Sequence, residues 1–186
     1  MRLVAKRKDH TTNGLITYAK GMDKSIGEKE KLLPYVKEGV ILEIGCGAGA
    51  VTELLAKNFP KSTIIGLDNS KQMIAVANRR KYSSSNVHLF QGDVLNKQFK
   101  TGTLDTVVMS SVFHEIYSYN NYNMKAIYKA IANACEMLGP EGRLLIRDGV
   151  MPELKPCYLK FIKPELREVF EKFAKYFVPR KIHYSF

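Results

Sequence analysis

The sequence predicts an α/β fold in which a mostly parallel, twisted sheet is covered by helices on both faces, as a three-layer sandwich. Short apolar segments rich in β-branched residues alternate along the chain with segments whose apolar residues recur at helical spacing. Strands that alternate with helices are joined by right-handed crossovers, which produce a parallel sheet with both faces covered. No internal repeat or low-complexity linker divides the 186 residues, so a single layered core is expected.

Five segments are expected to be strands because each is short, apolar and mostly β-branched. They cover residues 40–44, 63–67, 87–91, 104–110 and 143–147. In sheets of this kind, ligands bind beyond the carboxyl ends of the strands, near the point where the strand order reverses. The chemistry is therefore expected just after Ile44, Leu67, Gln91, Ser110 and Arg147.

The helices are predicted from capping residues and apolar spacing. One helix is expected to begin after Ser25, with Glu28 as the capping-box partner of the serine, and to run toward Val36. Ser70 is placed to cap another helix. The remaining apolar stripes and a favourably placed proline predict helices over 51–57, 70–77, 126–137 and 164–176.

Composition limits the cellular setting. The apolar runs are too short to span a bilayer, which takes ~20 residues, so we expect a cytoplasmic protein with no membrane attachment. Three cysteines without paired spacing indicate neither a disulfide framework nor a zinc site, and no metal is expected. The formal net charge of +11 would suit an anionic partner, but the charges are dispersed, as on solvated faces.

A glycine-rich turn follows the first predicted strand, within residues 43–50. Gly45 permits a tight turn, Gly47 allows a ligand to approach the backbone, and Gly49 or Ala50 allows the next helix to pack closely. The amino terminus of that helix favours an anion, either a pyrophosphate or the carboxylate of an amino acid. Glycines also mark ordinary turns between a strand and a helix, so this motif needs a second signal.

Asp68 supplies the second signal, because it ends the next strand 23 residues after Gly45. A carboxylate about 20 residues beyond the glycine turn is the usual acceptor for ribose hydroxyl groups. Alternatively, Asp68 or Asn69 caps the helix that begins at Ser70. Together, the turn and the carboxylate predict a nucleoside cofactor. The spacing also satisfies the dinucleotide pattern, so an NAD-dependent oxidoreductase and a non-catalytic cofactor-binding module remain alternatives.

The stretch from about Gly39 to Gly149 resembles the successive motifs of the class I, Rossmann-like S-adenosylmethionine-dependent methyltransferases. The matching segments are 40–49 for the first motif, 65–70 for the second, 91–94 for the third, 104–111 for the fourth strand, and 137–146 for the fifth. The acidic residue of the first motif, Glu43, distinguishes this pattern from dinucleotide enzymes, where that position is usually apolar. The implied cofactor is S-adenosyl-L-methionine, which leaves S-adenosyl-L-homocysteine as product.

The resemblance also implies roles for individual residues. Glu43 would lie near the methionine amine, Asp68 would bind the ribose, and Asn69 and Met73 would lie against the adenosine. Asp93 would accept a hydrogen bond from the adenine amine, or alternatively belong to an ordinary Gly-Asp turn. The complete set of expected cofactor-binding residues is Glu43, Gly45, Cys46, Gly47, Gly49, Asp68, Asn69, Met73, Gly92, Asp93, Val94 and Ser110.

The substrate side is expected in the polar segment 110–123, interpreted as a loop that lines the pocket. Methyl transfer needs a base only when the acceptor must lose a proton, and His114 is the candidate catalytic base. The alternative is that His114 only packs at the pocket rim. Asp148, at the end of the fifth strand, is a second candidate for the substrate side. An aromatic wall for a planar or cationic acceptor is expected from Tyr117, Tyr119 and Tyr122.

The acceptor is expected to be a small molecule. Residues 110–113 lack the Asn/Asp-Pro-Pro-Tyr-like sequence of amino-methyltransferases that act on DNA bases. RNA is the alternative acceptor, through the basic amino terminus and the run Arg79-Arg80-Lys81.

The domain organisation is interpreted as a helical lead-in over residues 1–38 followed by a single Rossmann-like domain over 39–186. The family's full sheet ends in an antiparallel strand hairpin. Only 37 residues follow Gly149, enough for one helix and a terminal strand over 180–186 without a partner. We therefore expect a fragment or a shortened variant that lacks the complete C-terminal hairpin.

Overall fold

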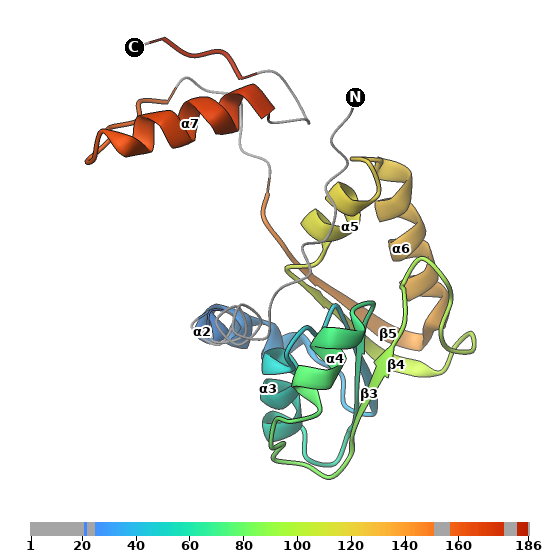
Figure 1. The fold of residues 1–186 in the computed structure, drawn as a ribbon. Coiled ribbons are helices and arrows are strands. Elements are labelled where there is room, and N and C mark those ends of the chain that lie inside the picture. Colours follow the sequence, from blue (N-terminus) through green and yellow to red (C-terminus); the bar gives the residue numbers. More distant parts are fainter. Residues whose placement is uncertain (1–20, 22–24, 151–156, 177–181, 186) are drawn as a thin grey trace. The chain divides into compact units, whose positions relative to one another are not determined.

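A computed structural model of the chain describes residues 21, 25–150, 157–176 and 182–185. Five parallel strands form one sheet in the order β3-β2-β1-β4-β5 (Figure 1). Their bounds are β1 (Val40–Ile44), β2 (Thr63–Asp68), β3 (Val87–Gln91), β4 (Leu104–Ser110) and β5 (Leu138–Arg147). The parallel sheet predicted from the sequence is confirmed, although β5 begins five residues earlier than expected.

The strand order reverses at β1. The chain moves from β1 to β2 and then to β3, and returns to place β4 on the other side of β1. The ends of β1 and β4 are therefore neighbours, with Ile44 opposite Met109 in the register. The carboxyl ends of β1 and β4 lie side by side at this reversal, which is where α/β folds bind their ligands.

Helices cover both faces of this sheet (Figure 1). Before β1 the chain forms α2 (Ile26–Lys29) and the 3-10 helix η1 (Glu30–Tyr35). The connections between strands contain α3 (Ala50–Asn58), α4 (Lys71–Ala77), α5 (Phe113–Tyr119) and α6 (Met124–Met137). The helices predicted over 51–57, 70–77 and 126–137 are thereby confirmed, and the Ser70 hydroxyl accepts from the backbone N–H of Met73 at 3.3 Å, as its capping role requires.

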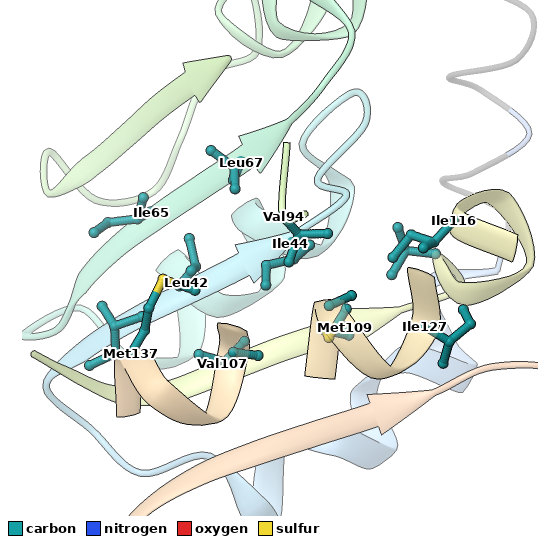
Figure 2. Close-up of a cluster of buried hydrophobic side chains, with 14 of the residues drawn as sticks. Leu42, Ile44, Ile65, Leu67, Val94, Val107, Met109, Ile116, Ile127 and Met137 are labelled. Carbon is teal, nitrogen blue, oxygen red and sulfur yellow. The ribbon is translucent and has the colours of Figure 1, made fainter. Parts of the chain in front are cut away.

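Alternate residues of each strand supply the two hydrophobic cores, because successive side chains of a strand point to opposite faces. On one face, Leu42 and Met109 pack with residues of α6 that include Ala130 and Met137 (Figure 2). On the other face, Ile41 packs with Leu55 of α3 and with Val36. The apolar strands are thus buried on both sides, as expected for a parallel sheet in a three-layer fold.

Three local expectations are wrong. The Ser25 side chain does not cap the helix that follows it, and the expected single helix is a four-residue α-helix followed by η1. Pro34 lies inside η1, and a proline has no N–H to donate to the preceding turn, which disfavours a continued α-helix. The segment expected to be a loop after the fourth strand also contains helix α5.

The described residues after Gly149 belong to a second compact unit. It contains α7 (Glu165–Tyr176), which agrees with the helix predicted over 164–176. The Phe170 ring contacts Phe161 and Tyr184, with ring centroids 5.7 and 5.1 Å away. Of the terminal strand expected over 180–186, residues 182–185 have no regular structure and the others lie outside the described residues. No helix in the described part of the chain is long and apolar enough to cross a membrane.

Removing a core side chain of α6 tests this packing. Met137 is fully buried, whereas Tyr128 on the same helix is 64% exposed. We expect Met137→Ala to lower the free energy of unfolding by about 2–5 kcal/mol, because it leaves a cavity against the sheet. Tyr128→Ala should change it by about 0.5 kcal/mol or less. Chemical denaturation measures both, and equal effects would contradict the described core.

Candidate functional site

The glycine turn between β1 and α3 is held against the end of β2. Gly45, Gly47 and Gly49 have φ angles of +76°, +53° and +79°, which L side chains rarely adopt. The backbone N–H groups of Gly45 and Cys46 both donate to the Leu67 carbonyl, at 2.7 and 3.0 Å. A Cβ on Gly45 would lie 2.5 Å from a Val112 methyl carbon. The turn therefore needs glycine for its conformation and for the space beside it.

Asp68 joins this turn to the next one. Its Oδ2 accepts from the Gly47 N–H at 2.9 Å, and its Oδ1 accepts from the Ser70 N–H at 2.8 Å. The Ser70 side chain caps α4, so Asp68 does not cap this helix but holds the backbone of the capping residue, and it also lies beside the glycine turn. Each carboxylate oxygen has more than one lone pair, so these bonds leave capacity for further donors.

Two hollows open at this carboxyl edge of the sheet. The smaller one, of about 60 Å³, lies over the ends of β2 and β3, and the larger one, of about 350 Å³, lies over the ends of β1 and β4. Residues lining both hollows are Gly45, Asp68, Val112 and Glu115. The two hollows therefore adjoin at Asp68.

The smaller hollow collects the expected residues of the second and third motifs. Asn69, Gly92, Asp93 and Val94 line it, together with Tyr119. Asp93 forms a local turn in which its Oδ1 accepts from the Leu95 N–H at 2.9 Å. This hollow combines apolar walls with the carboxylate group of Asp93 at its rim.

The larger hollow collects residues that follow β1 and β4. Of the residues expected to bind the cofactor, Gly45, Gly47, Asp68, Met73 and Ser110 line it. Ser110 is 8% exposed, and its hydroxyl has no hydrogen-bond partner among the described residues. A buried hydroxyl without a partner is costly, so Ser110 is suited to a polar ligand atom.

Three expected cofactor-binding residues lie behind the walls of these hollows. Glu43, Cys46 and Gly49 are buried, and none of them lines either hollow. Glu43 lies on the face of β1 that packs against α3, where its Oε2 accepts from the Thr52 hydroxyl at 2.5 Å. Burial also raises the pKa of the Cys46 thiol, which disfavours a thiolate.

The electrostatic environment of Glu43 is unusual for a carboxyl group. Burial raises the pKa of Glu43 to about 7, and the nearby Asp68 carboxylate acts in the same direction. The hydrogen bond from Thr52 and the positive charges of Lys29 and Arg80 oppose this rise. A positively charged group close to Glu43 would therefore stabilise the ionised form of this carboxyl group.

His114 and Asp148, predicted separately, are in direct contact. His114 is the second residue of α5 and lines the larger hollow, and its Nδ1 lies 3.0 Å from Asp148 Oδ1. Asp148 also accepts from the backbone N–H groups of Phe113 and Gly149, at 2.7 and 2.8 Å. Burial alone would raise the pKa of Asp148, but the hydrogen bonds from His114, Gly149 and Phe113 together lower it. Asp148 thus fixes both the start of α5 and the imidazole ring.

The expected tyrosine wall is only partly assembled. Tyr119 lines the smaller hollow, whereas Tyr117 packs against the hydrophobic core and makes an edge contact with Tyr122 at 5.5 Å between ring centroids.

One residue of the basic run that suggested RNA binding, Arg79-Arg80-Lys81, makes a hydrogen bond within the fold. Arg80 donates from Nε to the Ala48 carbonyl at 3.0 Å and so supports the glycine turn.

Comparison with known proteins identifies the family. The family model described as "Methyltransferase domain" matches residues 41–142, which is more than half of the chain. The chain belongs to this family. Membership confirms the resemblance to class I S-adenosylmethionine-dependent methyltransferases, and with it the cofactor expected for the family.

Individual relatives agree with this assignment. A malonyl-[acyl-carrier protein] O-methyltransferase of Priestia megaterium is 34% identical over 129 residues, covering 66% of this chain and 42% of the relative. A trans-aconitate 2-methyltransferase of Deinococcus radiodurans is 27% identical over 118 residues, covering 63% of this chain and 41% of the relative. The chain thus spans less than half the length of these curated relatives.

A solved structure supports the fold. The crystal structure of a SAM-dependent methyltransferase from Aquifex aeolicus matches with a TM-score of 0.60 at 23% identity, covering 75% of this chain and 77% of that one. At this identity the likeness concerns the fold alone. It confirms the three-layer, Rossmann-like arrangement predicted from the sequence.

Several residues that line the hollows were not predicted from the sequence. Lys29 lines the larger hollow, and Val112 and Glu115 line both. No motif marks Lys29, which is one of several lysines in a basic segment before the first strand. Val112 and Glu115 lie in the segment 110–123 that was expected to line the pocket, but no feature of the sequence singled them out.

The raised pKa of Glu43 predicts a pH dependence of stability. In the folded protein the pKa is about 7, above the reference value of 4.5, so the folded state holds the proton more tightly. This contribution to stability is complete below about pH 4.5 and is lost as the pH rises through about 7, by up to about 3 kcal/mol. Replacing Glu43 with Gln should remove this fall and keep an acceptor for Thr52. Denaturation of both proteins from pH 4 to 8 measures the difference, and parallel profiles would rule it out.

Proposed function

We propose that this chain transfers the methyl group of S-adenosylmethionine to a small-molecule acceptor. The observation that carries the proposal is the pair of adjoining hollows that meet at Asp68, on the carboxyl edge where the strand order reverses. This arrangement suits a ligand with a nucleoside at one end and an amino acid at the other. Family membership supplies the identity of that ligand.

The residues divide the binding task by position. Asp68 accepts from the ribose hydroxyls, while Asp93 accepts from the adenine amine and Val94 packs on the ring. Asn69, Met73 and Gly92 surround the adenosine. The turn of Gly45, Cys46, Gly47 and Gly49 lets the ligand approach the backbone, and Glu43 attracts the methionine amine from beneath that turn. The Ser110 hydroxyl, which lacks a partner among the described residues, binds a polar atom in the larger hollow.

The cofactor supplies a methyl group on a positively charged sulfur, which makes the transfer an in-line displacement. The protein therefore acts mainly by positioning, and a base is needed only for an acceptor that must lose a proton. The relatives are named for malonyl-[acyl-carrier protein] and trans-aconitate, and neither is a nucleic acid. These names favour a small acceptor group over RNA.

For an acceptor that must lose a proton, we propose His114 as the base and Asp148 as its positioning residue. A carboxylate oxygen can only accept, so Nδ1 of His114 carries the proton toward Asp148. Nε2 is then available to accept a proton from an acceptor in the larger hollow. Tyr119, at the smaller hollow, remains the tyrosine best placed to contact a ligand.

Ligand binding tests the proposed function directly. We expect S-adenosylhomocysteine to raise the melting temperature and NAD to leave it unchanged. A ligand present at about 100 times its dissociation constant stabilises the folded state by about 2.7 kcal/mol. Asp68→Asn should weaken binding about 10- to 100-fold, because a charge-assisted hydrogen bond to the ribose is lost.

Asp105→Asn is the matched control for this experiment. Asp105 also accepts a backbone N–H, that of Val40, at 2.9 Å, but it lies at the start of β4, on the opposite edge of the sheet. Its replacement should leave ligand binding unchanged. Stabilisation by NAD and not by S-adenosylhomocysteine would reject the proposed function in favour of an oxidoreductase.

The contact between His114 and Asp148 can be tested without knowing the acceptor. His114→Leu removes one of the donors that lower the pKa of Asp148, so this pKa should rise in the variant. Carboxyl ¹³C NMR over a pH titration measures the change. Asp105 serves as an internal reference, since its pKa is lowered by the Val40 N–H and Lys37 and should not move. An unchanged Asp148 titration would show that the imidazole is not held by this carboxylate.

A further inference from the structure

We propose that Lys29 binds the carboxylate of the amino-acid part of S-adenosylmethionine, an inference that rests on the proposed function. No motif of the sequence marks this residue, and the inference comes from its burial and its place on the wall of the larger hollow. It assigns to α2, which precedes the first strand, a direct part in cofactor binding.

The burial of Lys29 is the first observation. Only 4% of the residue is exposed, although lysines are almost never fully buried without a negative partner. The neighbouring Lys31 shows the ordinary behaviour, with a 73% exposed side chain that pairs with Glu28 at the surface. Folding therefore buries the ammonium group of Lys29 but leaves that of Lys31 in water.

The second observation is what lies around Lys29. It lines the larger hollow together with Gly45 and Gly47 of the glycine turn. Among the described residues that line this hollow, Lys29 is the only lysine or arginine. Within the part of the chain that the structure describes, Lys29 is therefore the lysine or arginine placed to pair with an anionic group beside the glycine turn.

The third observation is the electrostatic interaction between Lys29 and Glu43. The positive charge of Lys29 lowers the pKa of Glu43, so the two groups are electrostatically coupled. A zwitterionic amino acid carries one ammonium and one carboxylate on the same carbon. The buried carboxylate of Glu43 and the buried ammonium group of Lys29 match both charges, Glu43 for the amine and Lys29 for the carboxylate.

The alternative is that Lys29 only compensates the buried carboxylates of Glu43 and Asp68. A ligand without the carboxylate distinguishes ligand binding from charge compensation. If Lys29 only compensates Glu43 and Asp68, its replacement should affect binding of the ligand equally with and without the carboxylate. Decarboxylated S-adenosylmethionine keeps the adenosine, the sulfonium and the amine. It is therefore the matched probe for this one contact.

Isothermal titration calorimetry of the wild type and Lys29→Met with both ligands tests the proposal. We expect Lys29→Met to weaken S-adenosylmethionine binding about 10- to 100-fold, the effect of one hydrogen bond to a charged group. The same change should alter the affinity for decarboxylated S-adenosylmethionine by about twofold or less, because groups that do not interact give additive effects. Lys29→Arg, which keeps the charge, should restore part of the affinity for the intact cofactor. Lys31→Met controls for the loss of one positive charge and should change neither affinity.

Each other outcome has a distinct meaning. Equal weakening of both ligands in Lys29→Met would overturn the proposal and assign Lys29 a purely structural role. If that variant does not fold, the wild type still decides, because equal affinity for the two ligands would show that the carboxylate has no partner. Failure of the wild type to bind either ligand would instead reject the proposed function.

Discussion

The bonds accepted by the Asp68 carboxylate are the interaction on which the site depends. One oxygen holds the Gly47 N–H and the other holds the Ser70 N–H, so a single side chain joins the turn after β1 to the turn after β2. The parallel pairing of β1 and β2 brings these turns together, and the left-handed glycines let the first turn come close enough to be held. The two hollows adjoin at this carboxylate, so on the proposed function the residue that holds the loops also contacts the centre of the ligand.

The sequence predicted the sheet well because its strands are buried on both faces and therefore read as short apolar runs. It failed where the deciding contact is distant. Helix α5 begins at Phe113, whose N–H is accepted by Asp148 from the end of β5, 35 residues later. No residue within the segment 110–123 indicates that Asp148 would accept this N–H. The start of β5 was missed for another reason: its first half reads as a turn, and Glu141 has a left-handed φ of +59° within the strand.

The site was predictable to the extent that topology alone brings its parts together. Residues that end parallel strands meet at one edge, so Asp68, Asp93 and Ser110 could be assigned to a single site from their positions after the strands. Contacts that depend on the direction of a side chain could not be predicted from the order of the strands. His114 and Asp148 were singled out separately, and their contact depends on the helical turn that begins α5. Lys29 carries no local signal, since burial of a lysine is a property of the tertiary structure.

The charge of the hollows bears on which ligand state the site favours. The chain as a whole is strongly basic, at +11, yet among the described residues the carboxyl side chains that line the hollows are Asp68, Asp93 and Glu115, against the one ammonium group of Lys29. Carboxylates close to a bound sulfonium stabilise it by Coulomb attraction, which is stronger in a partly enclosed site than in water. Loss of the methyl group turns the sulfonium into a neutral thioether, and this attraction is then lost. On the proposed function, the residues that favour binding of the reactant therefore hold the product less strongly, while the contacts to ribose and adenine are the same for both. An acidic site within a basic chain thus favours release of the product without a change in the fold.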